Sequence, residues 1–262
     1  MVMDVDKARM DSGNFVKSLA RGLAVIRSFD ADNPTLTLAQ VARRAQIPPA
    51  AARRFLRTLE TLGYVRSDDR AFALTPKVLE LGHSYLSALS LPELMQPHLE
   101  RLSAKVGESV SAAVLAGADI IYIARVPTQR IMTVAITIGT RFPAAVTSMG
   151  RVLLSDWADD DVVALLEESP VEQFTDKTTT HHEDLLKVLA QARQEGWVMV
   201  EGELESGLRS IAAPIRDKTG QIVAAINVSA STSQRPREET LDHHLPLLLD
   251  TAEAINAELR LQ

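Results

Sequence analysis

Apolar residues recur at helical spacing near the start of the chain and predict three short helices. The first, Ser18–Phe29, has apolar side chains at positions 19, 23, 26 and 29, the period of one helix face. The second begins at Thr37, which forms a T-x-x-Q capping box with Gln40. The third, Pro49–Leu62, starts with a residue suited to the first helical position. It is followed by Gly63, where a left-handed residue is favoured.

A short hairpin follows these helices. Residues Tyr64–Thr75 alternate as two strands around a polar turn, Ser67–Arg70. Three helices and such a wing predict a winged helix-turn-helix over residues 15–75, preceded by a disordered polar tail over residues 1–14. Pro76 then opens an apolar-faced helix that we interpret as a linker over residues 76–90.

The remaining residues, 91–262, alternate between strand and helix patterns, and consecutive strands are joined by hairpins. A mostly antiparallel sheet with helices at its ends is therefore expected, and the fold class is α+β. The predicted strands are Ser109–Leu115, Asp119–Val126, Met132–Ile138, Trp197–Val200, Ser210–Ile215 and Ile222–Val228. The predicted helices are Ser148–Asp156, Asp159–Glu167, Glu183–Glu195 and Pro236–Leu261.

Charge is divided between these two parts. Residues 1–77 hold 13 Lys and Arg against 8 Asp and Glu, a net charge of +5, whereas residues 78–262 hold 15 against 26, a net charge of -11. The basic N-terminal part would attract phosphates, whereas the acidic C-terminal part would be repelled by nucleic acid. The pattern therefore predicts that the first part binds duplex DNA.

The predicted DNA-binding residues share a place on the helix-turn-helix or on its wing. The second helix of the pair lies in the major groove, and cationic side chains supply affinity by neutralising phosphates. They are Arg43, Arg44, Ala50, Ala51, Arg53, Arg54, Arg57, Arg66 and Arg70. Since Ala50 and Ala51 offer only methyl contacts, Arg53 and Arg54 are the candidates for base readout and Arg57 for a phosphate contact.

Several phrases of the sequence resemble the IclR family of bacterial transcriptional regulators. SLARGLAVIRSFD, LTLAQVARRAQIP and FLRTLETLGYV resemble its DNA-binding domain. GTRFPAAVTSMGRVLLS and GLRSIAAPIRDKTGQIVAAINVSA resemble its effector-binding domain, which has a GAF-like fold. The stretch RIMTVAITIGTRFPAAVTSMGRVLL further resembles the regulators of aromatic-acid catabolism through protocatechuate and β-ketoadipate. Family members often carry Ser or Thr at positions 50 and 51. This departure bears on which operator sequence is read and not on DNA binding itself.

This resemblance implies an effector pocket over the sheet, bordered by two loops and the last strand. Its expected residues are Met132, Val134, Thr147, Ser148, Met149, Gly150, Glu203, Arg209, Ser210, Asn227 and Ser229. Free N–H groups at the start of the helix near Met149 and Gly150 suit a carboxylate, and Arg209 would pair with a second one. Asn227 and Ser229 alternate on one strand face, where a ligand would satisfy them. A small carboxylate is therefore the expected effector.

Structural roles are alternatives for several of these residues. Ser148 would serve as a helix cap, and Arg209 would bridge to Glu203 or Glu205. Asn227 would bond a neighbouring loop. Met132 and Val134 would belong to the core.

Other function classes have weaker support in the sequence. A hydrolase would use Ser148 or Ser210 with a histidine, but no G-x-S-x-G motif is present. A zinc site at His181-His182 or His243-His244 would lack any cysteine ligand. We expect no enzyme, no metal and no cofactor. The main alternative is a winged-helix structural adaptor without a small-molecule ligand.

Composition and the symmetry of helix-turn-helix proteins indicate where the protein acts and how it assembles. The chain has no cysteine, no run of 18 apolar residues and no apolar signal segment, which favours a cytoplasmic protein without membrane contact. Helix-turn-helix proteins bind two half-sites as dimers, so a near-palindromic operator is expected. The helix from Ser18 and the linker helix are the expected dimer surfaces. The family resemblance also implies dimers of dimers.

Overall fold

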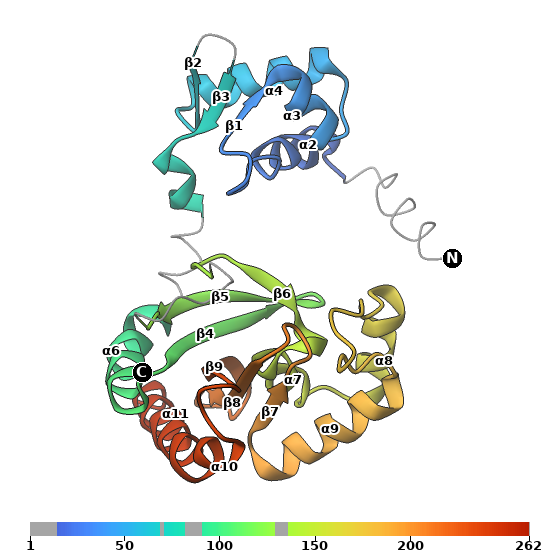
Figure 1. Ribbon diagram of the computed structural model, residues 1–262. Coiled ribbons are helices and arrows are strands. Elements are labelled where there is room, and N and C mark those ends of the chain that lie inside the picture. Colours follow the sequence, from blue (N-terminus) through green and yellow to red (C-terminus); the bar gives the residue numbers. More distant parts are fainter. Residues whose placement is uncertain (1–14, 69–70, 82–90, 129–135, 262) are drawn as a thin grey trace. The chain divides into compact units, whose positions relative to one another are not determined.

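The computed structural model describes residues 15–68, 71–81, 91–128 and 136–261 (Figure 1). The chain divides into two compact units, Met1–Leu89 and Ser90–Gln262, and each is described by itself. No helix in the described ranges is long and apolar enough to cross a membrane.

The first unit is a three-helix bundle with a small sheet. Its helices are α2 (Lys17–Ile26), α3 (Leu38–Arg44) and α4 (Pro49–Thr61). Its strands are β1 (Thr35–Thr37), β2 (Val65–Asp68) and β3 (Ala71–Leu74), in the antiparallel order β1-β3-β2. The strand β1 is an addition to the predicted hairpin, because three residues are too few to show a strand period. The predicted winged helix-turn-helix is confirmed.

The start of α3 and the turn after α4 have the local structure predicted from the sequence. The Thr37 hydroxyl accepts from the Gln40 N–H, and the Gln40 side chain accepts from the Thr37 N–H, so the capping box is complete. Gly63 has φ +82°, a left-handed conformation that glycine adopts without steric cost. Val25, Val41 and Leu56 are fully buried in the shared core.

The second unit is a six-stranded antiparallel sheet in the order β6-β5-β4-β9-β8-β7 (Figure 1). The strands are β4 (Ser109–Ala116), β5 (Asp119–Val126), β6 (Arg141–Pro143), β7 (Val198–Glu201), β8 (Leu208–Arg216) and β9 (Ile222–Ser231). All neighbouring strands run antiparallel, which confirms the predicted mostly antiparallel α+β fold.

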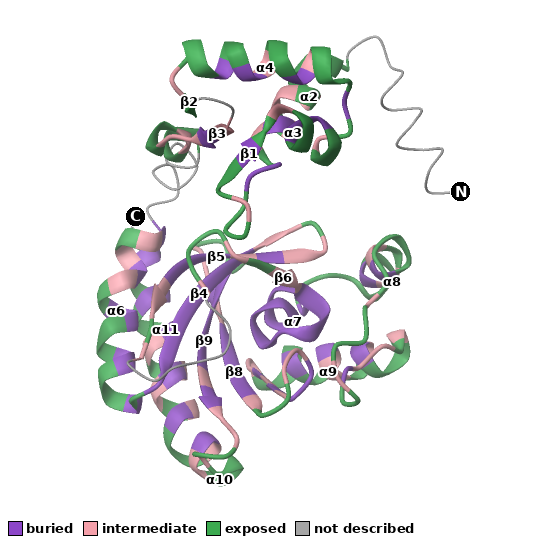
Figure 2. Ribbon diagram, turned by 45° about the horizontal axis from the view of Figure 1, so that its top comes forward, coloured by how far each residue is buried: buried purple, intermediate pink, exposed green. Residues whose placement is uncertain are grey.

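The second unit also contains six α-helices within the described residues. They are α6 (Leu91–Val106), α7 (Ser148–Leu154), α8 (Asp159–Glu168), α9 (His182–Glu195), α10 (Arg237–Glu239) and α11 (Leu245–Leu259). Helices α6 and α11 pack together on β4, β5, β8 and β9, while α7 packs on β4, β7, β8 and β9. Figure 2 shows α7 buried along its whole length. The site described below lies between α7 and the sheet.

Three predicted elements differ from the structure. After Pro76 only one 3-10 turn, Pro76–Val78, and a short helical continuation to residue 81 are described, and the rest of the predicted linker helix lies outside the described residues. The predicted strand over residues 132–138 lies partly outside them too, and residues 136–138 are not in a strand. The last helix is interrupted by one π-helical turn, Thr240–His244.

Candidate functional site

The outer side of α4 presents the predicted recognition surface. Ala50, Arg53, Arg54 and Arg57 are exposed, and Ala51 is half-buried. None of these three arginines forms an ion pair with a described residue. Their guanidinium groups are therefore available for phosphates or base edges.

The remaining predicted DNA-binding arginines differ in their surroundings. Arg43 and Arg66 are exposed, whereas Arg44 forms an ion pair with Asp30. Hydrogen bonds from Asn33, together with the Arg44 charge, lower the pKa of Asp30. A DNA contact by Arg44 would therefore compete with this pair. Arg70 lies outside the described residues.

A small cavity, partly open to solvent, lies between α7 and the sheet of the second unit. Its wall is mainly apolar, with polar groups from β5, β8, β9 and the start of α7. The residues that line it are Tyr122, Arg125, Ile136, Val146, Thr147, Ser148, Met149, Val200, Gly202, Glu203, Leu204, Leu208, Ser210, Asn227 and Ser229. An apolar pocket with a few converging polar groups is typical of a small-molecule site.

A β-bulge brings two polar residues of β5 to the same face of the sheet. Ala112 pairs with Ala124 and Ala113 with Tyr122, so Ile123 has no partner on β4. The extra residue shifts the alternation by one, and Tyr122 and Arg125 both line the cavity although they are three residues apart. Strict alternation from Tyr122 would have turned Arg125 away, and neither residue is among the effector residues expected from the sequence.

Arg125 enters the cavity as a cation without a carboxylate partner among the described residues. Its only described hydrogen bond runs from Nη1 to the Ser111 hydroxyl, 3.0 Å away. Burial lowers the pKa of Arg125, yet a guanidinium remains charged at neutral pH. Burial also raises the pKa of Tyr122 to about 12, so its phenol keeps its proton and is a hydrogen-bond donor. This end of the cavity therefore suits an anion.

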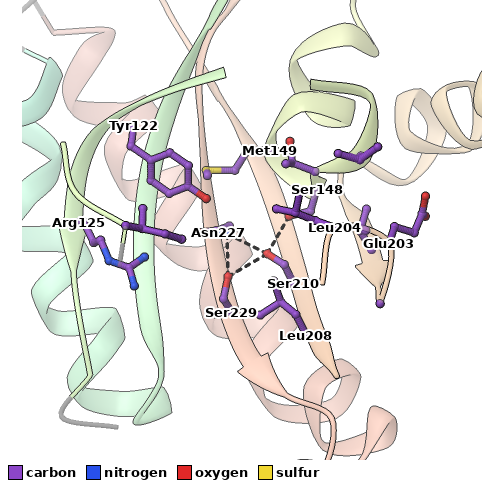
Figure 3. Close-up of a pocket in the computed structure, with 15 residues that line it drawn as sticks. Tyr122, Arg125, Ser148, Met149, Glu203, Leu204, Leu208, Ser210, Asn227 and Ser229 are labelled. Carbon is purple, nitrogen blue, oxygen red and sulfur yellow. Dashed lines mark hydrogen bonds between the residues drawn. The ribbon is translucent and has the colours of Figure 1, made fainter. Parts of the chain in front are cut away.

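A cluster of hydroxyl and amide groups lies at the other end of the cavity (Figure 3). The Ser148 hydroxyl donates to Ser210 Oγ over 2.8 Å. Asn227 Nδ2 donates to Ser210 Oγ at 2.8 Å and to Ser229 Oγ at 2.9 Å. The structure thus brings together four of the predicted effector residues from α7, β8 and β9.

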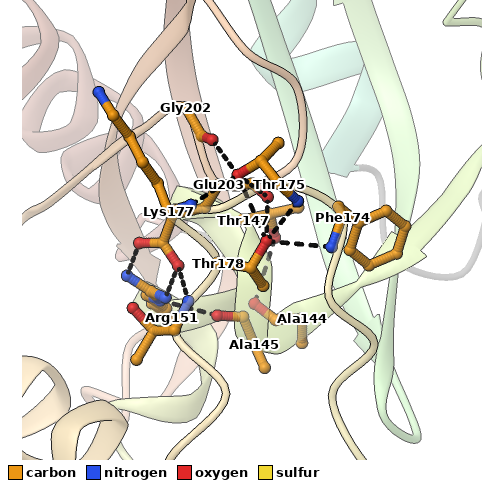
Figure 4. Close-up of polar contacts among 11 residues, drawn as sticks. Ala144, Ala145, Thr147, Arg151, Phe174, Thr175, Lys177, Thr178, Gly202 and Glu203 are labelled. Atoms are coloured by element: carbon orange, nitrogen blue, oxygen red, sulfur yellow. Dashed lines mark hydrogen bonds and ion pairs between the residues drawn. The ribbon is translucent and has the colours of Figure 1, made fainter.

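Arg151 and Glu203 form a buried ion pair that holds one wall of the cavity (Figure 4). Arg151 Nη1 and Nη2 bind the two carboxylate oxygens of Glu203 at 2.8 and 2.6 Å, and the Thr179 N–H donates to Glu203 Oε2 at 2.8 Å. Arg151 Nε donates to the Ala145 carbonyl at 2.7 Å. The pair therefore ties the Glu203 loop to the segment before α7, and the Glu203 carboxylate is already occupied.

The prediction that Arg209 contacts the effector is contradicted by its orientation. Arg209 and Ser210 are adjacent on β8, so their side chains point to opposite faces of the sheet, and only Ser210 lines the cavity. Arg209 Nε binds Glu201 at 2.7 Å, and Nη1 donates to the Arg235 carbonyl at 2.7 Å. The hydrogen bond from Arg209 lowers the pKa of Glu201. The alternative pairing with Glu203 or Glu205 also does not form.

The start of α7 differs from the predicted anion site. Thr147, rather than Ser148, is the N-cap, and its hydroxyl accepts the Gly150 N–H at 3.1 Å. A Cβ at Gly150 would lie 2.2 Å from the Ala144 carbonyl oxygen, so glycine is needed there for packing and not for ligand access. Thr147 and Met149 do line the cavity, and Gly150 does not. Met132 and Val134 lie outside the described residues.

The described residues give little support for a catalytic centre. No histidine is among the cavity-lining residues, so Ser148 and Ser210 have no imidazole base beside them. Within the described ranges, no group of three or more His, Asp or Glu side chains is placed to hold a metal ion.

Comparisons with known proteins match both units. Residues 18–69 match the IclR helix-turn-helix domain, and residues 83–257 match the bacterial transcriptional regulator IclR C-terminal domain. The Pca regulon regulatory protein of Pseudomonas putida is 46% identical over 90% of this chain and 81% of its own length. The p-hydroxybenzoate hydroxylase transcriptional activator of Acinetobacter baylyi is 35% identical over 91% of this chain and 90% of its own.

A solved structure extends the comparison to a bound ligand. An IclR homolog from Microbacterium hydrocarbonoxydans, in complex with 4-hydroxybenzoate, aligns with a TM-score of 0.83 and 27% identity. The alignment covers 94% of this chain and all of that one.

Proposed function

The chain belongs to the IclR family of bacterial transcriptional regulators, and on that premise we propose that a small carboxylate from aromatic-acid catabolism binds its cavity and controls its DNA binding. The observation that carries this proposal is Arg125, a cation in a mainly apolar cavity with no carboxylate partner among the described residues. The relatives support the ligand class, because their names refer to p-hydroxybenzoate and to the Pca regulon.

In this proposal residues 15–75 bind the operator, residues 76–90 connect the units and residues 91–262 bind the effector. A ligand changes DNA binding only if it binds two conformations of the protein unequally. A regulator of this kind would act in the bacterial cytoplasm. It would change the transcription of its target genes and would catalyse no reaction.

Substitution Arg125→Gln is expected to weaken the binding of benzoate or 4-hydroxybenzoate by about 10- to 100-fold, because a hydrogen bond to a charged group contributes about 1.5–3 kcal/mol. Titration calorimetry on the purified full chain measures this change. The control is Arg260→Gln, since Arg260 is a surface residue paired with Glu253 away from the cavity. Unchanged affinity in Arg125→Gln would contradict the proposed site.

We also propose that α2 forms a dimer interface with a second copy of the chain, so that two recognition helices read a near-palindromic operator. Four apolar residues of α2 and the segment before it are exposed: Phe15, Val16, Leu19 and Leu23 are 36%, 59%, 63% and 48% accessible. Neighbouring apolar side chains left exposed on one helix suit burial against an identical surface. Association through the second unit into a dimer of dimers is part of the same proposal.

Substitution Leu19→Asp is expected to shift the protein toward smaller assemblies and to weaken operator binding at least tenfold, because it places a charge in an apolar interface. Sedimentation velocity and a DNA titration at matched concentration measure both effects. Lys17→Asp on the same helix serves as the charge control. A Leu19→Asp protein with unchanged mass and operator affinity would remove α2 from the interface.

A further inference from the structure

A shallow hollow on the surface of the first unit lies where α2 and α3 both end. The residues that line it are Ala24, Arg27, Ser28, Arg44, Ala45 and Gln46. Two of them are arginines, none is acidic, and none belongs to α4. The hollow is therefore a second place, besides the exposed side of α4, where this unit presents positive charge.

Arg27 is the cation of this hollow that forms no ion pair with a carboxylate in the described part of the chain. It directly follows the last residue of α2 and is exposed. Arg44 differs, because its ion pair with Asp30 compensates its charge. A guanidinium offers several N–H donors and a permanent charge to an oxygen anion. The charge of Arg27 is therefore available for an anion from outside the unit.

The loop after α2 holds the two sides of the hollow together. Asp30 Oδ1 accepts hydrogen bonds from the Asn33 N–H and from Asn33 Nδ2, both at 2.8 Å. The other carboxylate oxygen, Oδ2, pairs with Arg44, so the loop is tied to the end of α3. A surface that is already held in place loses little conformational freedom when it binds a ligand.

Gln46 lines the hollow in a backbone conformation that is unfavourable for its residue type. Its N–H donates to the Arg43 carbonyl at 3.2 Å, and the Ile47 N–H donates to the Ala42 carbonyl at 3.0 Å, which is the hydrogen-bond pair that closes a helix around a left-handed residue. Gln46 has φ +53°, and no other described residue except glycine has a positive φ. The same pair of bonds ends α4 around Gly63, where glycine adopts this conformation without steric cost.

The Gln46 side chain forms no hydrogen bond with the described residues. It is exposed, so no bond of its own amide offsets the strained backbone. A strained residue whose side chain has no structural partner indicates a function at that position. The Gln46 amide and the Arg27 guanidinium are both donors and line the same hollow. Together they suit an oxygen anion.

The hollow is close enough to α4 to reach the DNA backbone. Gln46 lies four positions before Ala50, on the recognition surface, and four residues span at most about 14 Å. The major groove is about 12 Å wide and is bordered by phosphates on both sides. The wing follows the other end of α4, since β2 begins at Val65. The hollow and the wing therefore adjoin opposite ends of the recognition helix, where each would meet one border of the groove.

We propose that this hollow binds a backbone phosphate of duplex DNA, with Arg27 supplying the charge and Gln46 an amide hydrogen bond. Neither residue is among the DNA-binding residues expected from the sequence. The inference rests on DNA binding by the first unit, which is part of the proposed function, and it adds a contact at the end of α4 away from the wing.

Substitution Arg27→Ala is expected to weaken binding of a short duplex of scrambled sequence by about 3- to 10-fold. The magnitude of the slope of log affinity against log salt is expected to fall by about 0.9. A scrambled duplex is a sufficient probe, because a phosphate contact carries no sequence information. Fluorescence anisotropy of the labelled duplex, titrated with the full chain at several salt concentrations, measures both quantities.

Two further variants assign the effect to this hollow. Arg27→Lys is expected to retain the slope, because lysine keeps the charge. Arg21→Ala is the matched control, since Arg21 is an exposed arginine of α2 that does not line the hollow. An unchanged slope in Arg27→Ala, or an equal decrease in Arg21→Ala, would overturn the inference.

Substitution Gln46→Gly separates a DNA contact from a structural role. Glycine relieves the strained backbone, so the melting temperature of the first unit, followed by circular dichroism, is expected to rise by about 4 °C. The same variant loses the amide and is expected to bind the duplex at least about threefold more weakly, with an unchanged salt slope because the amide carries no charge. Gln46→Ala, which lacks the amide but keeps a Cβ, is expected to bind as weakly. A more stable Gln46→Gly protein with wild-type affinity would overturn the amide contact.

The inference and the proposed function fail in different ways. If the wild-type protein binds the duplex with a salt dependence that does not involve Arg27, the hollow is not a phosphate site and DNA binding through α4 stands. If the wild-type protein binds no duplex at low salt, DNA binding by the first unit itself fails.

Discussion

Substitution Glu203→Gln is expected to lower the free energy of unfolding of the second unit by about 3–5 kcal/mol, the usual cost of breaking a buried ion pair. Arg151 and Glu203 have side chains only 2% and 10% exposed. Without the carboxylate, the buried Arg151 guanidinium would keep its charge and lose the partner that compensates it. Urea unfolding followed by circular dichroism measures the change.

An exposed ion pair provides the matched control. Glu253 pairs with Arg260 on the surface, with side chains 66% and 50% exposed, so Glu253→Gln is expected to cost at most about 1 kcal/mol. The double variant Arg151→Met with Glu203→Leu removes both charges and is expected to recover much of the stability. A Glu203→Gln protein as stable as Glu253→Gln would contradict a structural role for the buried pair.

The first unit shows which features follow from local sequence. The capping box at Thr37 and the left-handed Gly63 depend on a few neighbouring residues, and the structure confirms both. The helical spacing of apolar residues also predicts α2, but this pattern cannot show that Leu19 and Leu23 stay exposed. Which apolar residues find a partner is decided by tertiary or quaternary packing.

The second unit shows where sequence reasoning stops. The family resemblance implies Ser148, Ser210, Asn227 and Ser229 as effector residues, and the alternation of Asn227 and Ser229 in an apolar strand supports two of them. The four residues lie together. Tyr122 and Arg125 are not among the effector residues expected from the sequence. A bulge places both on the face that lines the cavity, and the bulge depends on pairing with β4.

Neighbouring residues on α7 and β8 show the same limit. Arg209 and Ser210 cannot both face one cavity from adjacent positions of a strand, so only Ser210 lines it. Gly150 was expected to lie at a carboxylate site, whereas its missing side chain allows the Ala144 backbone to approach. Residue type alone decides neither the orientation of Arg209 nor the role of Gly150. Each depends on how a second segment of the chain is placed against the residue.

Replacing Arg53, Arg54 and Arg57 together by alanine is expected to weaken operator binding at least 100-fold, since each cationic contact to a phosphate or base contributes about 1–3 kcal/mol. The three side chains project from the exposed face of α4 and form no ion pair with described residues, so their charges are free to displace counterions. Alanine is a good helix former, and α4 should persist. The magnitude of the slope of log affinity against log salt should fall by about 1, because Arg57 is the expected phosphate contact and each such contact contributes about 0.9.

Single substitutions separate base readout from phosphate binding. Arg54→Ala is expected to cost about 1–3 kcal/mol on the operator and to relax sequence preference if Arg54 contacts a base edge. Arg57→Ala is expected to weaken binding to all duplexes alike, because a phosphate contact carries no sequence information. Arg260→Ala, in the second unit, is the control. Salt dependence reports the charges that contact DNA, so an unchanged slope in the triple variant would mean that α4 does not face the duplex. Salt-insensitive binding by the wild-type protein would favour the adaptor alternative.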